Sequence, residues 1–501
     1  MNHLIKTTAM AAMFATAVST SALAQDGKTL TYADFETVDA NWQMASADSY
    51  IGSRVGCYET LVRFNSKQGL EPELATAWEQ VEPTVWEFTL RKGVEFQDGT
   101  PLTAAAAAGA LNNLLTAEMP SGAFSPKVIE SVEAIGEDVV RITTRSPMEL
   151  LPAHLVAPPT SILSPAAYEG GQIDPIGHCT GPFEIVEVKP KEYLTFTRND
   201  NYWGGKPALE GGRALFIHDS NTRVNVIRSG EADIAFLIPP YSVSQLQGKQ
   251  GITLVTQKAP RVTELLLNNM KKPLDDVRVR QAIKAAIDSN AIAASVYEGL
   301  SPATASPFAA DDPWAPKGVV PTYDPAQAKA LLEEAGIQPG QLQLELLVYK
   351  SRAELKDVGA IIQAQLGEIG IKVNVRVAEY AAIEPDMTSG TYDMALMSRG
   401  YLIDVADPIG YLRADYSCGG SFNLSHYCSE EFDGQLDKAS SLSDPNARYE
   451  IYAQLAKQVS DEAITVFLVN ETLFDARKDN VENFEMDPLN FHLMTKDVTL
   501  K

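Results

Sequence analysis

The stretch from Leu70 to Leu102 constrains the fold more than any other part of this sequence. Apolar and polar residues alternate over residues 85–90 (VWEFTL), a turn-forming Arg-Lys-Gly follows at 91–93, and the alternation resumes at 94–96. A period of two is typical of a strand with one buried face. The pattern therefore predicts a hairpin with an aromatic inner face, leading through Thr103 into an alanine-rich helix.

The order of residues in this stretch also resembles the signature of a known family, the solute-binding proteins of peptide and nickel ABC importers (family 5). That signature is roughly L-x-P-x-L-A-x-x-W-E followed by F-x-L-R-x-G-V-x-F-x-D-G-x-P, and most of its fixed positions occur here between Leu70 and Pro101. Further segments that fit the family are 198–207 (RNDNYWGGKP), 230–236 (GEADIAF) and 273–282 (PLDDVRVRQA). The matches extend from about residue 58 to beyond residue 428.

The second half of the chain alternates between helical and strand-like patterns. Strands are expected at 342–348, 372–377 and 392–397, with helices at 325–335 and 353–369. Such alternation predicts a parallel-leaning sheet in an α/β lobe. We also expect a helix over Tyr50–Phe64, and a helix capped by Asp275 or Asp276.

The resemblance implies an α/β, two-lobed periplasmic-binding-protein type II fold with an extra subdomain in the first lobe. Lobe I would comprise residues 25–265 plus 475–501, with the extra subdomain at about 56–155, and lobe II would span 266–474. Linear sequence alone does not show this discontinuity. A chain of 501 residues is long enough for two sizeable cores.

The net charge of −24 and a pI near 4.7 argue against binding to nucleic acids or anionic membranes, because like charges repel. The first 24 residues have the features of a secretory signal peptide: Lys6, a short apolar core at 9–18, and a small-x-small cleavage site ending at Ala24. That apolar core is too short to span a bilayer. We therefore expect export to the periplasm, with the mature protein starting near Gln25.

Four cysteines in an exported chain favour two disulfides, for which three pairings are possible. The resemblance implies a disulfide between Cys418 and Cys428, which would leave Cys57 and Cys179 for the other. The competing hypothesis is a metal site, since histidines lie beside or near two of these cysteines.

The sequence contains no motif typical of catalysis. There is no H-E-x-x-H, G-x-S-x-G, Walker A or G-x-G-x-x-G pattern. We expect no enzymatic activity, no cofactor and no metal bound directly by the protein.

The segment 398–416 (SRGYLIDVADPIGYLRADY) holds the main ligand-contact candidate, Asp404. In peptide-binding members of the family an Asp in this register binds the ligand's α-ammonium group, and a carboxylate in a closed cleft suits that role. The alternative role is a turn or cap Asp ahead of Asp407-Pro408. For the ligand's carboxylate, the resemblance points to Lys356, with Arg352 about one turn earlier and Arg399 as a third candidate. Each of these charges could equally be a solvated surface group.

Aromatic side chains could line a cleft by stacking on a ligand. Tyr401 is the first choice because it lies three residues from Asp404, and the alternative for every aromatic is a place in the core. The full set of candidates is Trp42, Tyr58, Phe124, Tyr401 and Tyr411.

Together these features predict the periplasmic binding component of an ABC importer, which closes on short peptides or peptide-like amino-carboxylates. An alternative is nickel or another metal carried as an organic chelate. The arginine that nickel-type relatives place in R-P-x-R-F is absent at 156–162, yet residues 349–355 and 418–428 look closer to nickel-type members. The implied partners are an inner-membrane permease and cytosolic ATPases, with the binding protein a monomer; a periplasmic hydrolase or a ligand-presenting sensor is the remaining alternative.

Overall fold

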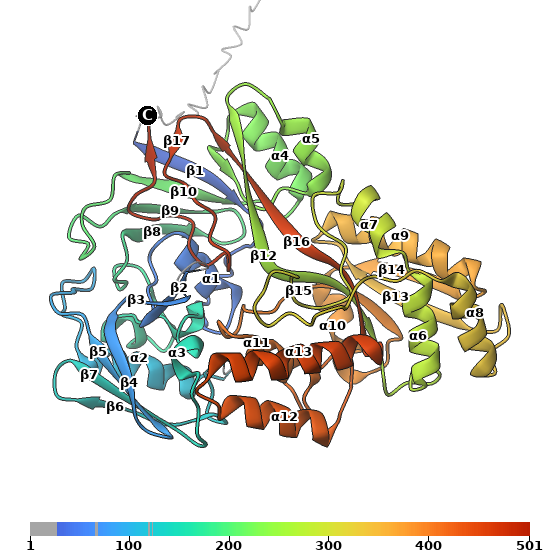
Figure 1. Cartoon of the computed structure of the whole chain (residues 1–501). Coiled ribbons are helices and arrows are strands. Elements are labelled where there is room, and N and C mark those ends of the chain that lie inside the picture. Colours follow the sequence, from blue (N-terminus) through green and yellow to red (C-terminus); the bar gives the residue numbers. More distant parts are fainter. Residues whose placement is uncertain (1–27, 66–68, 119–120, 123) are drawn as a thin grey trace, which may run out of the picture.

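The structure is a computed structural model that describes residues 28–65, 69–118, 121–122 and 124–501. The predicted signal peptide and its cleavage site lie outside the described residues. Within them, ten strands form one sheet in the order β14-β13-β15-β12-β16-β11-β1-β10-β9-β8 (Figure 1). The strands are β1 (Thr29–Asp34), β8 (Phe183–Lys189), β9 (Tyr193–Arg198), β10 (Gly211–Phe216), β11 (Ile234–Ala235), β12 (Ile252–Leu267), β13 (Gln343–Tyr349), β14 (Lys372–Ala378), β15 (Met394–Gly400) and β16 (Thr465–Lys478).

Two long antiparallel strands, β12 and β16, connect the two parts of this sheet. β12 has 16 residues, and at the usual rise per residue it spans roughly 50 Å. One end of β16 pairs with β11, and the Arg261–Leu267 end of β12 pairs with β15. We call β11, β1, β10, β9 and β8 the β1 side, and β15, β13 and β14 the β13 side. Figure 1 shows the two long strands running next to each other from one side to the other.

On the β13 side, β13 lies between β14 and β15 and is parallel to both, so the predicted parallel arrangement is confirmed. The apolar residues of β13 and β15 are largely buried, whereas the edge strand β14 is partly exposed. Asp276 caps α6, as predicted, by accepting a hydrogen bond from the backbone N–H of Arg278. The helices of this part are α6 (Val277–Ala286), α7 (Ser289–Ser295), α8 (Pro325–Glu334), α9 (Ala353–Glu368) and α10 (Tyr380–Ser389). Three further helices, α11 (Pro408–Tyr416), α12 (Glu430–Ser440) and α13 (Pro445–Asp461), share a core with the β1 side.

On the β1 side, β1 is parallel to its neighbours β10 and β11. The associated helices are α1 (Ala47–Arg54), α4 (Ser220–Ser229) and the short α5 (Val243–Leu246). The predicted helix over Tyr50–Phe64 is wrong in its second half. α1 ends at Arg54 and Gly56 takes a positive φ of 75°, which turns the chain into β2 (Val62–Asn65).

A separate four-stranded sheet, β4-β5-β7-β6, lies within the range expected for the extra subdomain. Its strands are β4 (Ala75–Glu82), β5 (Val85–Leu90), β6 (Ile129–Ile135) and β7 (Val139–Thr144), and α2 (Ala104–Leu115) packs on it. The alanine-rich helix predicted after Thr103 is α2, and the Thr103 side chain caps it by accepting from the N–H of Ala106. The remaining short elements are β3 (Gly69–Pro72), α3 (Leu151–His154), β17 (Val481–Glu482) and β18 (Thr499–Leu500).

The aromatic hairpin forms with a different partner from the one predicted. β5 pairs with β4 before it and with β7, whereas residues 94–96 form no strand. The reason is local: the N–H of Phe96 donates to Thr100 O and the N–H of Gly99 donates back to Phe96 O, so this segment folds into its own tight turn.

Several family motifs that lie far apart in the sequence meet in one buried group, which we call the signature cluster: Glu59, Glu73, Arg91, Tyr202 and Trp203. The Glu59 carboxylate accepts from the Tyr202 hydroxyl at 2.7 Å and from Trp203 Nε1 at 2.9 Å. The Arg91 guanidinium stacks on the Trp203 ring at 4.3 Å and donates to the backbone oxygen of Glu73.

The four cysteines form two disulfides, Cys57–Cys179 and Cys418–Cys428. The pairing implied by the resemblance is confirmed, and the alternative of a metal site at these cysteines is wrong. In the described ranges, no helix combines the length and apolar character needed to cross a membrane.

Candidate ligand-binding site

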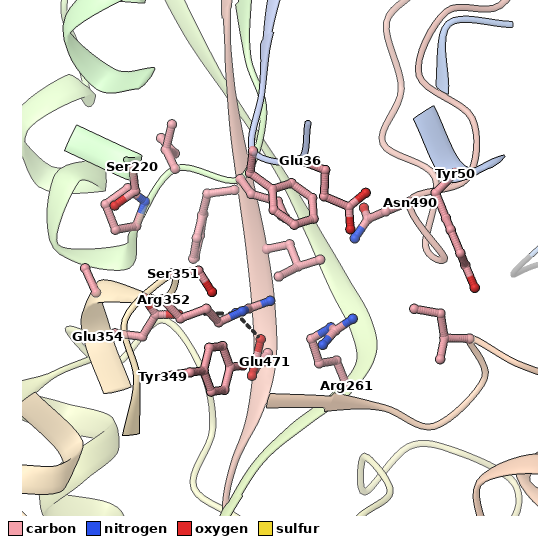
Figure 2. Close-up of a pocket in the computed structure, with 18 of the residues that line it drawn as sticks. Glu36, Tyr50, Ser220, Arg261, Tyr349, Ser351, Arg352, Glu354, Glu471 and Asn490 are labelled. Atoms are coloured by element: carbon pink, nitrogen blue, oxygen red, sulfur yellow. Dashed lines mark hydrogen bonds and ion pairs between the residues drawn. The ribbon is translucent and has the colours of Figure 1, made fainter. Parts of the chain in front are cut away.

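A cavity of about 600 Å³ lies where β12 and β16 pass between the two sides of the sheet (Figure 2). The β1 side contributes the end of β1, α1 and residues 237–240. The β13 side contributes the end of β13, the start of α9 and the start of α10. The long strands themselves contribute Arg261 and residues 471–474. A cavity of this size can hold a small organic solute.

Arg261 projects from β12 into the cavity because the strand is irregular at that point. The pairing of β12 with β16 breaks between Lys258 and Val262, and such bulges redirect side chains out of the ladder. The Arg261 guanidinium donates to the backbone oxygen of Ser398 at 2.8 Å and to its hydroxyl at 3.2 Å. Among the described residues, no carboxylate lies within ion-pair distance of Arg261.

The electrostatics of Arg261 follow from this arrangement. Burial lowers the pKa of its guanidinium, and the nearby charge of Arg352 lowers it further, although Glu471 opposes both. The positive charge of Arg261 is therefore only partly compensated. A ligand anion would supply the missing partner.

Arg352, at the start of α9, lies in the same region but already has partners. Its Nη1 is 2.8 Å from Glu471 Oε2 and 3.2 Å from Glu354 Oε1. Burial alone would raise the pKa of Glu471, but Arg352 and Arg261 lower it overall, so this carboxylate is ionised. Thr263 donates to the other oxygen of Glu471 at 2.8 Å. Arg352, Glu354, Glu471 and Thr263 thus form a network of ion pairs and hydrogen bonds that holds this wall of the cavity in place.

The wall on the β1 side carries a carboxylate, Glu36, at the end of β1. Its Oε2 is 2.5 Å from Arg54 Nη2, and Arg54 also pairs with the fully buried Asp34. Burial is the largest influence on Glu36 and raises its pKa. Figure 2 shows Glu36 and Asn490 on one wall and Arg261, Arg352 and Glu471 on the other.

Aromatic rings complete the cavity and give it apolar walls. Tyr349 and Tyr380 meet edge to face, with ring centroids 5.9 Å apart. The aromatic residues of the lining are Phe35, Tyr50, Tyr297, Tyr349, Tyr380, Phe422 and Phe474.

Of the predicted contact residues, Arg352 lines this cavity. Asp404 instead lines a second, largely apolar cavity of about 550 Å³ between α11 and residues 121–122, 125–128 and 148–154. Its Oδ2 accepts from Arg399 Nη2 at 3.0 Å, and Arg399 also pairs with Asp415 at 2.8 Å. Lys356 is exposed on α9.

The structure places the predicted aromatics in packed positions. The Tyr401 hydroxyl donates to Asp312 at 2.6 Å, and the Tyr411 hydroxyl donates to Glu264 at 3.1 Å. The rings of Trp42 and Tyr58 pack against each other, and Phe124 is fully buried. None of these five belongs to the lining of the 600 Å³ cavity within the described part of the chain. Their contact with a ligand stays a prediction.

Sequence reasoning missed Arg261, Glu36, Asn490 and Glu471. A signal existed for one of them: Ala259-Pro260 interrupts an otherwise strand-like run just before Arg261, and a proline in a strand often marks a bulge. No comparable pattern marks the other three, because the lining is assembled from distant segments.

The site has no arrangement suited to metal chemistry. No group of three or more His, Cys, Asp or Glu that could hold a metal ion occurs in the portion of the chain that the structure describes. A cavity between two α/β lobes, joined by long strands and lined by aromatic and charged side chains, is typical of a solute-binding protein of the two-lobed kind.

The comparisons with known proteins agree with this class. Residues 69–423 match the family of bacterial extracellular solute-binding proteins, family 5 (middle region), so the chain belongs to that family. It is 27% identical to the dipeptide-binding protein of Escherichia coli (strain K12) over 515 residues, covering 94% of this chain and 95% of the relative. It is 26% identical over 459 residues to the nickel-binding periplasmic protein of the same organism, covering 86% and 87% respectively.

The fold also matches solved structures. NikA from Brucella suis in complex with Fe(III)-EDTA superposes with a TM-score of 0.84 at 25% identity, covering 94% of this chain and all of that one. The protein is therefore a non-enzymatic solute-binding component for ABC import, of the peptide and nickel class.

Proposed function

We propose that this protein binds a small amino-carboxylate, such as a short peptide, in the 600 Å³ cavity and delivers it to an importer. Arg261 binds the carboxylate of the solute, and the aromatic walls enclose its apolar part. The observation that carries this proposal is the partly buried Arg261 guanidinium, which has no carboxylate partner among the described residues. A solute carboxylate supplies that partner at little cost, because the guanidinium is already held in place by Ser398.

The same proposal assigns the location and the motion. The protein works in the periplasm after removal of residues 1–24, as a monomer that meets a permease with cytosolic ATPases. Residues 25–265 plus 475–501 form one lobe and 266–474 the other, with β12 and β16 as the hinge. Rotation of the lobes about these strands opens and closes the cavity between them.

A second candidate ligand is a metal carried by an organic chelator. The relatives named for nickel, and the complex of a similar protein with Fe(III)-EDTA, support it. Since the described residues offer no direct metal site, the contacts would be made by the chelator's carboxylates, again with Arg261.

Isothermal titration tests the proposal. The purified protein is titrated with di- to pentapeptides, and in parallel with carboxylate chelates of nickel and iron. Saturable binding of at least one carboxylate-bearing solute, recovered unaltered afterwards, is the expected result. Chemical turnover of the solute, or no binding by any carboxylate-bearing member, would contradict the proposed function.

A further inference from the structure

The wall of the cavity opposite Arg261 carries side-chain oxygens that accept no hydrogen bond from the described residues. Glu36 and Asn490 both line the cavity, and Figure 2 shows them together on the β1-side wall. Each comes from a different part of the chain, the end of β1 and the segment after β17. No sequence motif joins them.

Glu36 belongs to a group that lacks one positive charge. Arg54 is shared between Glu36 and Asp34, with Nε 2.8 Å from Asp34 Oδ2 and Nη2 2.5 Å from Glu36 Oε2. One guanidinium therefore pairs with two carboxylates, and the second positive charge that acts on Glu36, that of Arg261, makes no ion pair with it in the described residues. Asp34 is fully buried, whereas about 30% of the Glu36 side chain is exposed, and its Oε1 accepts no hydrogen bond from any described residue. The Glu36 carboxylate, whose negative charge is only partly compensated, is thus accessible from the cavity.

Asn490 supplies an independent observation. Its side-chain oxygen is buried and makes no hydrogen bond with any part of the chain that the structure describes. The backbone takes a positive φ of 60°, and the turn is fixed because the Asp487 carboxylate accepts from the N–H groups of Phe491 and His492. A buried acceptor without a donor costs free energy, so this position is suited to a donor from outside the chain.

We propose that Glu36 and Asn490 form the receptor for a cationic donor group of the solute, while Arg261 binds its carboxylate across the cavity. This inference rests on the proposed function and narrows it: the solute is zwitterionic, with an ammonium or similar group on the β1-side wall. A solute with acidic groups alone would leave the charge of Glu36 unmatched and would add a second negative charge to the cavity.

This assignment differs from the one that the resemblance implies. There, Asp404 binds the ammonium group, but here the Asp404 carboxylate is paired with Arg399 and faces the second cavity. Tyr50 lines the first cavity, and burial, then the charges of Asp404 and Glu36, raise the pKa of its hydroxyl. The two assignments therefore predict different residues for one recognition event, and a mutational comparison separates them.

The experiment uses the full mature protein and the peptide panel above, each peptide paired with its N-acetyl form. Glu36→Gln keeps the shape of the side chain and removes its charge. We expect it to weaken binding of the tightest free-amino peptide about tenfold to a hundredfold, and to erase most of the preference over the N-acetyl form. Asn490→Gly tolerates the positive φ and removes the buried oxygen, so it tests the second acceptor even where Glu36→Gln disturbs the Arg54 pair.

Glu87→Gln is the matched control, because Glu87 also pairs with an arginine (Arg141, 2.5 Å) but in the extra sheet, away from the cavity. We expect it to bind as the wild type does. Three results would overturn the inference. The first is wild-type affinity in both Glu36→Gln and Asn490→Gly, and the second is a loss of affinity confined to Asp404→Asn. The third is that the tightest ligand has no cationic group. Failure of every member to bind wild-type protein would instead refute the proposed function, and the inference with it.

Discussion

The signature cluster and the ligand cavity are both built around buried carboxylates and arginines, but they differ in how completely those groups are satisfied. In the signature cluster both oxygens of Glu59 accept hydrogen bonds, and Glu73 accepts two from Thr60 at 2.8 Å. In the cavity, Arg261 lacks a carboxylate and Asn490 lacks a donor among the described residues. The fully hydrogen-bonded groups of the signature cluster can stabilise the fold, whereas the cavity groups that lack partners could accept a ligand.

The two regions also differ in their relation to the sequence. The signature cluster contains the residues by which the chain resembles its family, drawn from segments 58–60, 70–91 and 198–207. The cavity residues lie outside those motifs. The resemblance therefore reports on the shared scaffold, whereas the residues that we propose as ligand contacts lie outside the family signature.

The largest effect should follow from Trp203→Ala. The substitution removes a large ring, ends the stacking with Arg91 and leaves one oxygen of Glu59 without its donor, so we expect a loss of about 3 kcal/mol in the free energy of unfolding. Urea denaturation measures this change, and titration of the still-folded protein should give wild-type affinity. If Trp203→Ala weakened ligand binding without lowering the free energy of unfolding, the signature cluster would not be distinct from the ligand cavity in the way proposed.

The reverse pattern is expected for Arg261→Gln. Loss of the charge should weaken binding of a carboxylate-bearing solute by about 2 kcal/mol, or roughly thirtyfold, with little change in stability, because Arg261 makes no ion pair with the described residues. Arg448→Gln is the control: Arg448 also donates to backbone oxygens, but on α13 and outside the cavity lining. An affinity of Arg261→Gln equal to that of the control would argue against the anion site.

A smaller effect concerns pH. Burial, and then the charge of Glu59, raise the pKa of Glu73 to about 7, above the value of about 4.3 for an exposed Glu. The folded protein therefore holds this proton more strongly, and Glu73 lowers the free energy of unfolding as the pH rises from about 4.3 to 7. Glu73→Gln should reduce that decline by roughly 1–2 kcal/mol, measured by denaturation at pH 5 and pH 7. The same decline in mutant and wild type would show that Glu73 does not titrate in this range.

Much of the fold could be predicted because local rules and the resemblance agreed. The strand and helix patterns of residues 342–397 gave the parallel β13 side, and Thr103 and Asp276 cap the helices expected of them. The predictions were wrong where tertiary contacts determine the bounds of an element. α1 ends at Arg54, and the chain turns at Gly56, where any side chain would meet the backbone of Met494; no local pattern shows that contact.

The site was much less predictable. Arg352 was found because the resemblance placed a charge near the start of that helix, whereas Asp404, in the expected register, faces a different cavity. Glu36, Arg261 and Asn490 are separated by more than two hundred residues from one another along the chain. The large sheet brings β1, which precedes Glu36, and β12, which carries Arg261, into one structure, and the segment after β17 adds Asn490 to the same cavity.

The most direct test is a crystal structure of the protein purified from periplasmic extract and complexed with its tightest-binding solute from the titration panel. We predict that the solute lies in the 600 Å³ cavity where β12 and β16 pass between the two sides of the sheet, with an acidic group within hydrogen-bond distance of the Arg261 guanidinium. A solute bound instead in the second cavity beside Asp404, with Arg261 still bonded to Ser398 alone, would contradict it.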